Sequence, residues 1–343
     1  MTTRPRVALL ALACLLLAAG AGGVLWRAAD RAAAKDRPRA GGPVLTEGRV
    51  TLDRPTEPGG LIVLRNMAWG PHRDELATVH ADDPTGPRTV SGVKCLRFHA
   101  AAGTGVCLRA VPGALTESYE AVVLDSRLRP RATKPLAGIP TRARVAPDGR
   151  RVAWTVFVGG DSYAGTNFST RTSILDLDTG RYDASLEEYA IVKDGAPYRA
   201  ADVNFWGVTF AADGRTFYAT LATGGRTHLV RGDLAARTVT TLRENVECPS
   251  LSPDGHRIAF KKRVPGLPAE APWRLYVLDL RSGAETALAE TRSVDDQAVW
   301  VDPDTLEYSL PGDSGADLLT VPADGTGSPR VLTRAALAPA WLR

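Results

Sequence analysis

The residues in this sequence best suited to chemistry are carboxylates, and few stand at the spacing that an enzyme needs. Asp295 and Asp296 are adjacent, and with Glu247 they could hold a metal ion or exchange a proton with a substrate. The five histidines, at positions 72, 80, 99, 228 and 256, do not have the spacing of zinc ligands. The sequence therefore predicts no metal site and no cofactor, with metal-assisted catalysis by these carboxylates as the alternative.

Three further segments resemble motifs of catalytic or calcium-binding sites, but the residues that such sites also need are absent or the segment is better explained as a turn. Gly312–Gly315 reads Gly-Asp-Ser-Gly, as around the nucleophile of trypsin-like serine proteases, but the His motif of that family is absent. The stretch 160–164, Gly-Asp-Ser-Tyr-Ala, misses the last glycine of the G-x-S-x-G motif. Asp176, Asp178 and Asp183 could suggest calcium, but Asp-Leu-Asp-Thr-Gly is better explained as a turn. We interpret none of the three as catalytic or metal-binding.

The strongest pattern in the chain is a repeated unit of strands and tight turns, which must position any site. In its clearest copy, residues 249–288, Pro253-Asp254-Gly255 predicts a turn because Pro fixes φ and Gly accepts a positive φ. His256–Lys261 and Arg274–Leu280 then predict strands, and a second turn follows at 281–283. Four antiparallel strands in about 40 residues is the size of one propeller blade.

The same order of turn, strand and turn recurs at residues 142–186, 206–242 and 298–333. Repetition at this period is typical of a propeller. The Asp and Gly residues of the first turn in each copy are predicted to be structural: Asp148, Gly149, Asp213, Gly214, Asp254 and Gly255.

The unit resembles the propeller repeats of the TolB family, which read roughly Trp-Ser-Pro-Asp-Gly-x-x-Ile-Ala-Phe followed by Leu-Tyr-Val-Leu-Asp-Leu-x-Thr-Gly. The resemblance is closest at 249–288 and covers nearly all of the chain after about residue 60. It implies an all-β fold over residues 49–343, a six-bladed β-propeller of four-stranded antiparallel blades, with seven blades as the alternative. We expect the protein to be a monomer. Pro339-Ala340-Trp341 would then be the inner strand that completes the first blade and closes the ring.

The N-terminal segment 1–26 contains a 20-residue apolar run without a charge, Val7–Trp26. At about 1.5 Å per residue, a helix of this length can cross the roughly 30 Å hydrocarbon core of a membrane. We expect a single-pass signal anchor with the propeller outside the cytoplasm; a signal peptide cleaved near Ala19–Ala21, and hence a secreted protein, is the alternative. Residues 27–48, rich in Ala, Arg, Gly and Pro, are expected to be a flexible tether.

Two cysteines are predicted to form a disulfide. Cys95 and Cys107 flank residues 101–105 symmetrically, so a hairpin that turns there would place them opposite each other. Export would permit the bond, and two buried thiols are the alternative. Cys248 would remain free. The strands expected in this region are Leu61–Leu64, Leu76–His80, Lys94–His99, Val106–Ala110 and Ala121–Asp125.

The blade connectivity separates the loops into two faces. The first-to-second and third-to-fourth turns of each blade are tight and lie at one end, the turn face. The insertions 112–119, 159–170, 187–203, 264–272 and 311–316 lie at the other end, the long-loop face, where the inner strands begin. Predicted binding residues on this face are Arg142, Asp161, Tyr163, Asn167, Arg199, Asn204, Trp206, Glu247, Asp295, Asp296 and Gln297, with Phe168 and Trp273 as added apolar anchors. The alternative is that these residues only cap strands and solvate the channel.

Charge and the family resemblance bound the function. The formal net charge is only +4, much of it in the first 40 residues, which argues against nucleic-acid binding. The TolB resemblance implies a non-catalytic binding or scaffold module of the cell envelope, whose partner is another envelope protein or a small ligand. The alternatives are a propeller hydrolase or lyase with a site at the channel mouth, and a membrane-tethered sensor of a small molecule or glycan.

Overall fold

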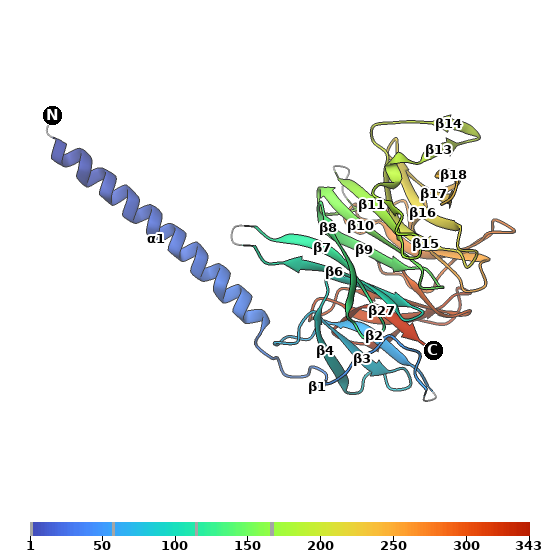
Figure 1. Cartoon of the computed structure of the whole chain (residues 1–343), viewed down its shortest axis with the longest axis horizontal. Coiled ribbons are helices and arrows are strands. Elements are labelled where there is room, and N and C mark those ends of the chain that lie inside the picture. Colours follow the sequence, from blue (N-terminus) through green and yellow to red (C-terminus); the bar gives the residue numbers. More distant parts are fainter. Residues whose placement is uncertain (1–2, 57–58, 114–115, 165–167) are drawn as a thin grey trace. The chain divides into compact units, whose positions relative to one another are not determined.

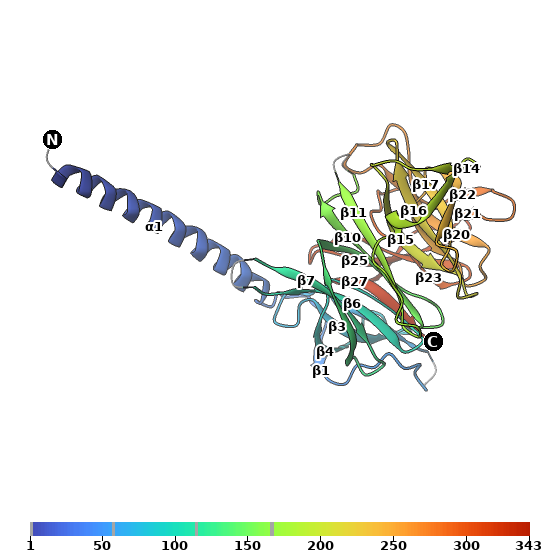
Figure 2. The same cartoon turned by 45° about the horizontal axis from the view of Figure 1, so that its top comes forward.

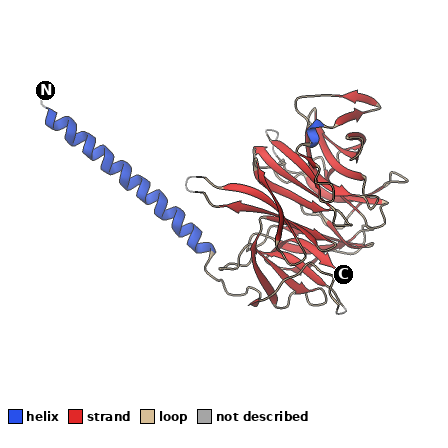
Figure 3. Cartoon of the chain, in the orientation of Figure 1, coloured by secondary structure: helices blue, strands red, loops and turns tan. Residues whose placement is uncertain are grey.

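The computed structural model describes residues 3–56, 59–113, 116–164 and 168–343. The chain divides into two compact units, Met1–Gly42 with Ala68–Arg73, and Pro43–Met67 with Asp74–Arg343. The first unit contains the single long helix, and the second contains the strands (Figure 3). In the first unit, the ring of Trp69 lies between two guanidinium groups, with Arg39 4.1 Å and Arg73 4.3 Å from its centroid.

The helix, α1 (Thr3–Lys35), spans the apolar run in which a helix was predicted. It continues through residues 27–35, which were expected to belong to a flexible tether, because Ala, Arg and Lys are strong helix formers. Within the described part of the chain, no helix meets the length and apolarity needed to span a membrane.

The second unit is a six-bladed β-propeller, which confirms the predicted fold and rules out seven blades (Figure 1). Blade 1 contains β27 (Ala336–Leu342), β2 (Leu61–Asn66), β3 (Glu75–His80) and β4 (Arg88–Lys94). Blade 2 contains β5 (Arg97–Ala101), β6 (Thr104–Val111), β7 (Ser118–Leu124) and β8 (Pro130–Leu136). Blade 3 contains β9 (Ile139–Val145), β10 (Arg151–Gly159), β11 (Ser169–Asp176) and β12 (Tyr182–Asp183).

The remaining blades follow in chain order, coloured from yellow-green to red-orange in Figure 2. Blade 4 contains β15 (Asn204–Phe210), β16 (Thr216–Thr223), β17 (Arg226–Asp233) and β18 (Thr238–Glu244). Blade 5 contains β19 (Glu247–Leu251), β20 (Arg257–Arg263), β21 (Trp273–Asp279) and β22 (Glu285–Ala287). Blade 6 contains β23 (Val299–Asp302), β24 (Thr305–Leu310), β25 (Asp317–Pro322) and β26 (Arg330–Thr333).

Blades 1 and 4 have more than the four strands that the sequence predicted for each blade. β1 (Leu45–Glu47) pairs in parallel with β4, so the end of the expected tether is part of blade 1. The segment 187–203, expected as a loop, instead contains a hairpin of β13 (Ala190–Lys193) and β14 (Ala196–Tyr198) after the short helix η1 (Leu186–Glu188). β13 pairs in parallel with β18, so blade 4 has six strands, and the outer edge of β18 is covered.

The ring is closed by β27, which pairs with β2 as its innermost strand, as predicted. β5, β9, β15, β19, β23 and β27 each contact the next strand in this order, and together they surround the axis. Arg88 fastens the closure: its buried guanidinium donates to the carbonyl oxygens of Arg334 and Ala335, at 2.5 and 2.8 Å, immediately before β27.

The inner strands are irregular where they line the axis. In five of the six blades the pairing of the inner strand with the second strand shifts register, at β9, β15, β19, β23 and β27. A β-bulge changes the direction of the side chains beside it. Gly207 (φ +66°) and Cys248 (φ +51°) hold left-handed conformations at two of these shifts. The bulges therefore decide which side chains face the channel.

The first-to-second turns match the predicted motif. Gly149, Gly214 and Gly255 have φ values of +72°, +67° and +74°. The preceding carboxylates accept backbone N–H groups two residues on, with Asp148 and Asp254 bonded to the amides of Arg150 and His256 at 3.0 and 2.9 Å. These residues stabilise turns, and apolar clusters between neighbouring blades form the rest of the core.

Cys95 and Cys107 form a disulfide, although the predicted hairpin register is wrong. The hairpin turns at residues 102–103, so Cys107 on β6 lies opposite Phe98 on β5. Cys95 precedes β5, in the connection from blade 1, and reaches Cys107 with the two Cα atoms 5.4 Å apart. The bond therefore fastens the connection between blades 1 and 2 to blade 2.

Candidate functional site

Charged and aromatic side chains from blades 3 and 5 and from the connection into blade 6 meet where the inner strands begin. We call this group the channel-mouth network: Arg142, Tyr163, Glu247, Lys261, Arg263, Trp273 and Asp295. Of these, Arg142, Tyr163, Glu247 and Asp295 were predicted as binding residues, and Trp273 as an apolar anchor. Lys261 and Arg263, both on β20, were not predicted.

Lys261 is the centre of the network and is fully buried. Its Nζ lies 2.5 Å from Asp295 Oδ1, 3.9 Å from Glu247 Oε2 and 3.9 Å from the centroid of the Trp273 ring. Burial lowers the pKa of Lys261, but the negative charges around it, Asp295 first, outweigh this effect and leave the pKa raised. Lys261 is therefore a permanent cation and cannot act as a base at neutral pH.

Asp295 connects the network to solvent, since its side chain is 45% exposed. Arg142 Nη2 also approaches Asp295 Oδ1, at 3.3 Å. Burial would raise the pKa of Asp295, but the charges of Lys261 and Arg142 hold it at about 2. A carboxylate with so low a pKa is a weak general base.

Glu247 is fully buried and is held by donors from blade 5. Its Oε1 accepts hydrogen bonds from Arg263 Nε at 2.7 Å and from Trp273 Nε1 at 3.0 Å. Its Oε2 has no hydrogen-bond partner in the described ranges and faces Lys261. The charge of Glu247 is thus neutralised from two sides.

The aromatic residues expected to contact a partner are buried beneath this network. Tyr163 and Trp206 are 2% and 1% exposed, and their ring centroids lie 5.0 Å apart. Tyr163 Oη forms a 2.7 Å hydrogen bond with Thr141 Oγ1. Trp273 is also buried, and Phe168 packs against the same cluster. Tyr163, Trp206 and Trp273 are therefore not accessible to a partner in this structure.

Two other predicted residues brace the connection that leads into β23. Gln297 Nε2 donates to the carbonyl oxygens of Val208 and Pro249, at 3.1 and 2.7 Å, and so bridges blades 4 and 5. Asp296 Oδ2 accepts the backbone N–H and the hydroxyl of Ser309, at 2.9 and 2.6 Å. Both residues position Asp295.

The remaining predicted residues lie away from the network. Asp161 and Arg199 are exposed. Asn204 Oδ1 accepts the backbone N–H of Thr170 at 2.8 Å, and so ties β15 to β11. Asn167 lies outside the described residues.

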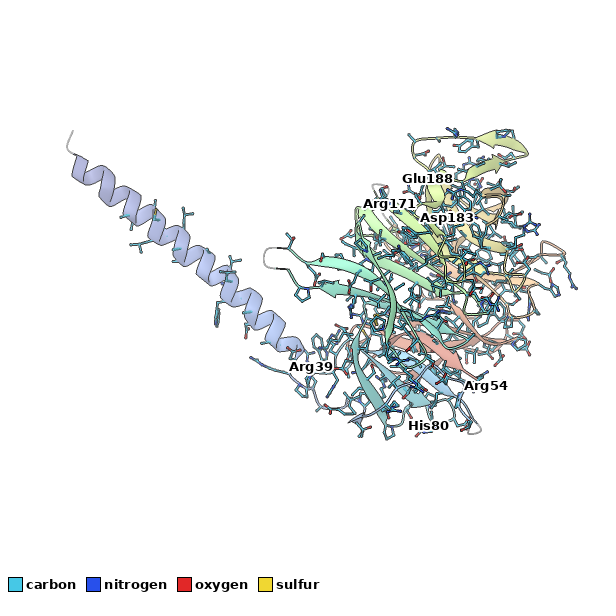
Figure 4. All side chains as sticks on the ribbon, in the orientation of Figure 1. Arg39, Arg54, His80, Arg171, Asp183 and Glu188 are labelled. Atoms are coloured by element: carbon cyan, nitrogen blue, oxygen red, sulfur yellow. A yellow bond between two sulfur atoms is a disulfide. The ribbon has the colours of Figure 1, made fainter. Side chains whose placement is uncertain are left out.

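Acidic residues elsewhere in the propeller are also engaged by other groups. Asp183, labelled in Figure 4 with Glu188, accepts a 2.8 Å hydrogen bond from Tyr189 Oη and is ion-paired with Arg237 and Arg181. No cluster of three or more His, Cys, Asp or Glu side chains suited to a metal ion occurs in the described part of the chain.

This chain resembles known proteins in structure but not detectably in sequence. No protein-family model and no curated protein sequence matches this chain. Among solved structures, TolB from Acinetobacter baumannii is 19% identical, with a TM-score of 0.51 over 84% of this chain and 68% of that chain. This is a TolB-like propeller fold. At such low identity the likeness concerns the fold alone.

Two other solved structures also align with most of this chain. A chain of a nidogen/laminin complex is 8% identical, with a TM-score of 0.52 over 83% of this chain and 98% of that chain. A puromycin-hydrolysing peptidase of Mycobacterium tuberculosis is 16% identical, with a TM-score of 0.47 over 88% of this chain and 48% of that chain. At these identities the comparisons establish the propeller fold and not the function, which must be argued from the site.

Proposed function

We propose that this protein is a non-catalytic binding module of the cell envelope, which binds another envelope protein through the long-loop face. The observation that carries the proposal is the neutralisation of the channel-mouth carboxylates. Lys261 and Arg142 hold Asp295, while Arg263 and Trp273 hold Glu247. Carboxylates paired in this way are poor metal ligands and poor bases, so the arrangement favours binding over catalysis.

Two further observations support a place outside the cytoplasm. The Cys95–Cys107 disulfide suits an oxidising compartment. The apolar segment Val7–Trp26 lies in α1. We propose it as the membrane tether from its uncharged apolar sequence, since no described helix meets the criteria for a membrane span. A reporter fused after Arg343 is expected to be active only outside the cytoplasm, with the protein in the membrane fraction. Activity of a reporter that works only in the cytoplasm would refute this topology.

The binding face can be tested by site-specific photo-crosslinking in native membranes. A photoreactive amino acid replaces Asp161 or Arg199, which are exposed residues of the long-loop segments, or Asp178 or Arg281, which are exposed residues of the turn face. We expect crosslinks to one envelope protein from the first pair only. Crosslinks from the turn face alone, or from neither face, would contradict the proposal.

A further inference from the structure

A small cavity in the central channel has an excess of hydrogen-bond donors. Its volume is about 40 Å³, and it lies between β5, β9, β27 and the connection into β23. The charged and polar side chains that line it are Arg97, His99, Thr141, Arg142, Arg144, Asp296 and Gln297. Three of these are guanidinium groups, and only one is a carboxylate.

The carboxylate does not balance the charge of the cavity. Asp296 accepts its hydrogen bonds from Gln297 and Ser309, and Arg142 is paired with Asp295. The remaining two guanidinium groups, those of Arg97 and Arg144, form no ion pair or hydrogen bond with a carboxylate among the residues that the structure describes, and Asp296 acts on both only at longer range. Burial lowers the pKa of each to about 10, so both remain cations at neutral pH.

Arg144 is the more confined of the two. It is 8% exposed, and its Nε has no hydrogen-bond partner in the described chain. Its Nη1 lies 3.1 Å from His99 Nε2. Buried polar groups are nearly always satisfied, so an unpartnered guanidinium nitrogen beside a cavity points to an acceptor that occupies the cavity.

His99 also points to an acceptor in the cavity, since both of its ring nitrogens face N–H donors. Nδ1 lies 3.1 Å from the backbone nitrogen of Val145, and Nε2 faces Arg144. Burial and the nearby charge of Arg144 hold the pKa of His99 well below its usual value, so the ring is neutral. A neutral imidazole has one acceptor nitrogen, and if it accepts from Val145 then Nε2 carries a proton. Two donors, Nε2–H and the Arg144 guanidinium, then lie side by side and need a common acceptor.

We propose that this cavity is a binding site for one oxyanion group, which accepts hydrogen bonds from Arg97, Arg144 and His99. Guanidinium groups bind carboxylate, phosphate and sulfate oxygens through paired, charge-assisted hydrogen bonds. The volume exceeds that needed for a single water and fits a compact group rather than a whole metabolite. The group is carried either by a free inorganic ion or by an organic ligand that enters from the long-loop face. This inference does not depend on the proposed partner.

The test uses thermal unfolding of the full-length protein in detergent. Sulfate, phosphate and acetate are each titrated against sodium chloride at equal ionic strength. We expect at least one of them to raise Tm in a saturable way at millimolar concentration, as a ligand of the folded state does. A response to sulfate or phosphate only indicates an inorganic ion or a phosphorylated ligand, and a response to acetate only indicates an organic carboxylate. Sulfate also stabilises proteins non-specifically, but without saturation.

Variants locate the effect. Arg97→Gln and Arg144→Gln are expected to weaken the apparent Kd at least tenfold, whereas Arg129→Gln, which removes an exposed partner of Asp125, keeps it unchanged. Two cavity variants are used so that misfolding of one leaves the other to decide, and calorimetric titration of the folded variant measures the loss directly. The same saturable response in Arg97→Gln and Arg144→Gln as in the wild type, or no response beyond that to chloride, would overturn the proposal.

Discussion

Individual buried charges in this propeller differ in how well they are satisfied. Arg88 donates to several oxygens, and Lys261 is surrounded by carboxylates and aromatic rings. Glu307 on β24 has fewer hydrogen-bond partners than its buried carboxyl group needs. It is fully buried, its Oε2 accepts a 2.5 Å hydrogen bond from Trp341 Nε1, and its Oε1 has no hydrogen-bond partner in the described ranges. Burial raises the pKa of Glu307 to about 8, despite the opposing effect of the Trp341 hydrogen bond.

This pKa predicts that the protein loses stability as the pH rises from about 5 to 8. In that window the unfolded chain has released the proton of Glu307, while the folded protein still holds it, so a rise in pH favours unfolding. Glu307→Gln is neutral at all pH values and is expected to be more stable than the wild type at pH 9, on the order of a few kcal/mol. Denaturant unfolding at pH 6 and pH 9 measures the difference.

The exposed Glu270 provides the control, because Glu270→Gln should leave the pH dependence of unfolding intact. Equal pH dependence of the wild type and Glu307→Gln would show that Glu307 ionises normally in the folded state.

At the residue scale, the sequence predicted the acidic members of the channel mouth better than their partners. Glu247 begins the inner strand β19 and Asp295 precedes the inner strand β23, so their positions followed from alignment to the turns. Lys261 and Arg263 lie at the end of a second strand, where basic residues normally point to solvent. Their inward direction depends on the bulges and on the neighbouring blade, neither of which has a local sequence signal. Arg97, His99 and Arg144 lie on the inner strands β5 and β9, and no local sequence signal shows which side of those strands faces the channel.

At the scale of elements, the irregular inner strands hold the channel together. Gly207 lies in the bulge of β15, and a Cβ added to it would stand 2.8 Å from the Cα of Cys248 on β19. The close approach of the two backbones is possible only without a side chain at position 207. The left-handed φ of Gly207 adds a second reason for glycine.

We therefore expect Gly207→Ala to destabilise the protein by roughly 3 kcal/mol or more, because the backbone strain and the clash with β19 add. Gly224→Ala is the matched control, since Gly224 has φ +59° but open space around it, and should cost only about 1–2 kcal/mol. Urea unfolding of both variants gives the two values. Equal losses would mean that β19 moves aside without cost.

The sequence predicted second and third strands of the repeated blades well and the outer strands poorly. Apolar runs such as Arg257–Arg263 and Trp273–Asp279 lie between two neighbours and carry a strong signal. β4 (Arg88–Lys94) and β8 (Pro130–Leu136) are outer strands with alternating exposure and polar sequences, and neither was predicted. Their strand conformation depends on pairing with β3 and β7.

At the scale of the whole molecule, the Cys95–Cys107 disulfide holds the connection between blades 1 and 2 against blade 2. The disulfide Cys95–Cys107 has a sequence separation of 12 residues, and a loop of that size predicts about 2–3 kcal/mol of stabilisation. Cys95→Ala/Cys107→Ala is expected to lose this amount in denaturant unfolding. Reducing agent should lower the Tm of the wild type and leave that of the double variant unchanged.

Thiol counting provides an independent check. Denatured, unreduced full-length protein should contain two free thiols, those of Cys14 and Cys248. Four free thiols would show that the bond does not form in the cell.

Because β27 closes the ring, blade 1 can be completed only after the rest of the propeller has been made. β2 and β27 are the first and last long strands of the propeller along the chain, yet they are neighbours in blade 1. Synthesis produces the N-terminal part first, so the inner edge of β2 stays unpaired while blades 2 to 6 form. A chain interrupted before β27 would keep that edge open and offer it to other strands. The ring therefore closes only once β27 has been made, because only β27 covers the edge of β2 that could otherwise pair with strands of other chains.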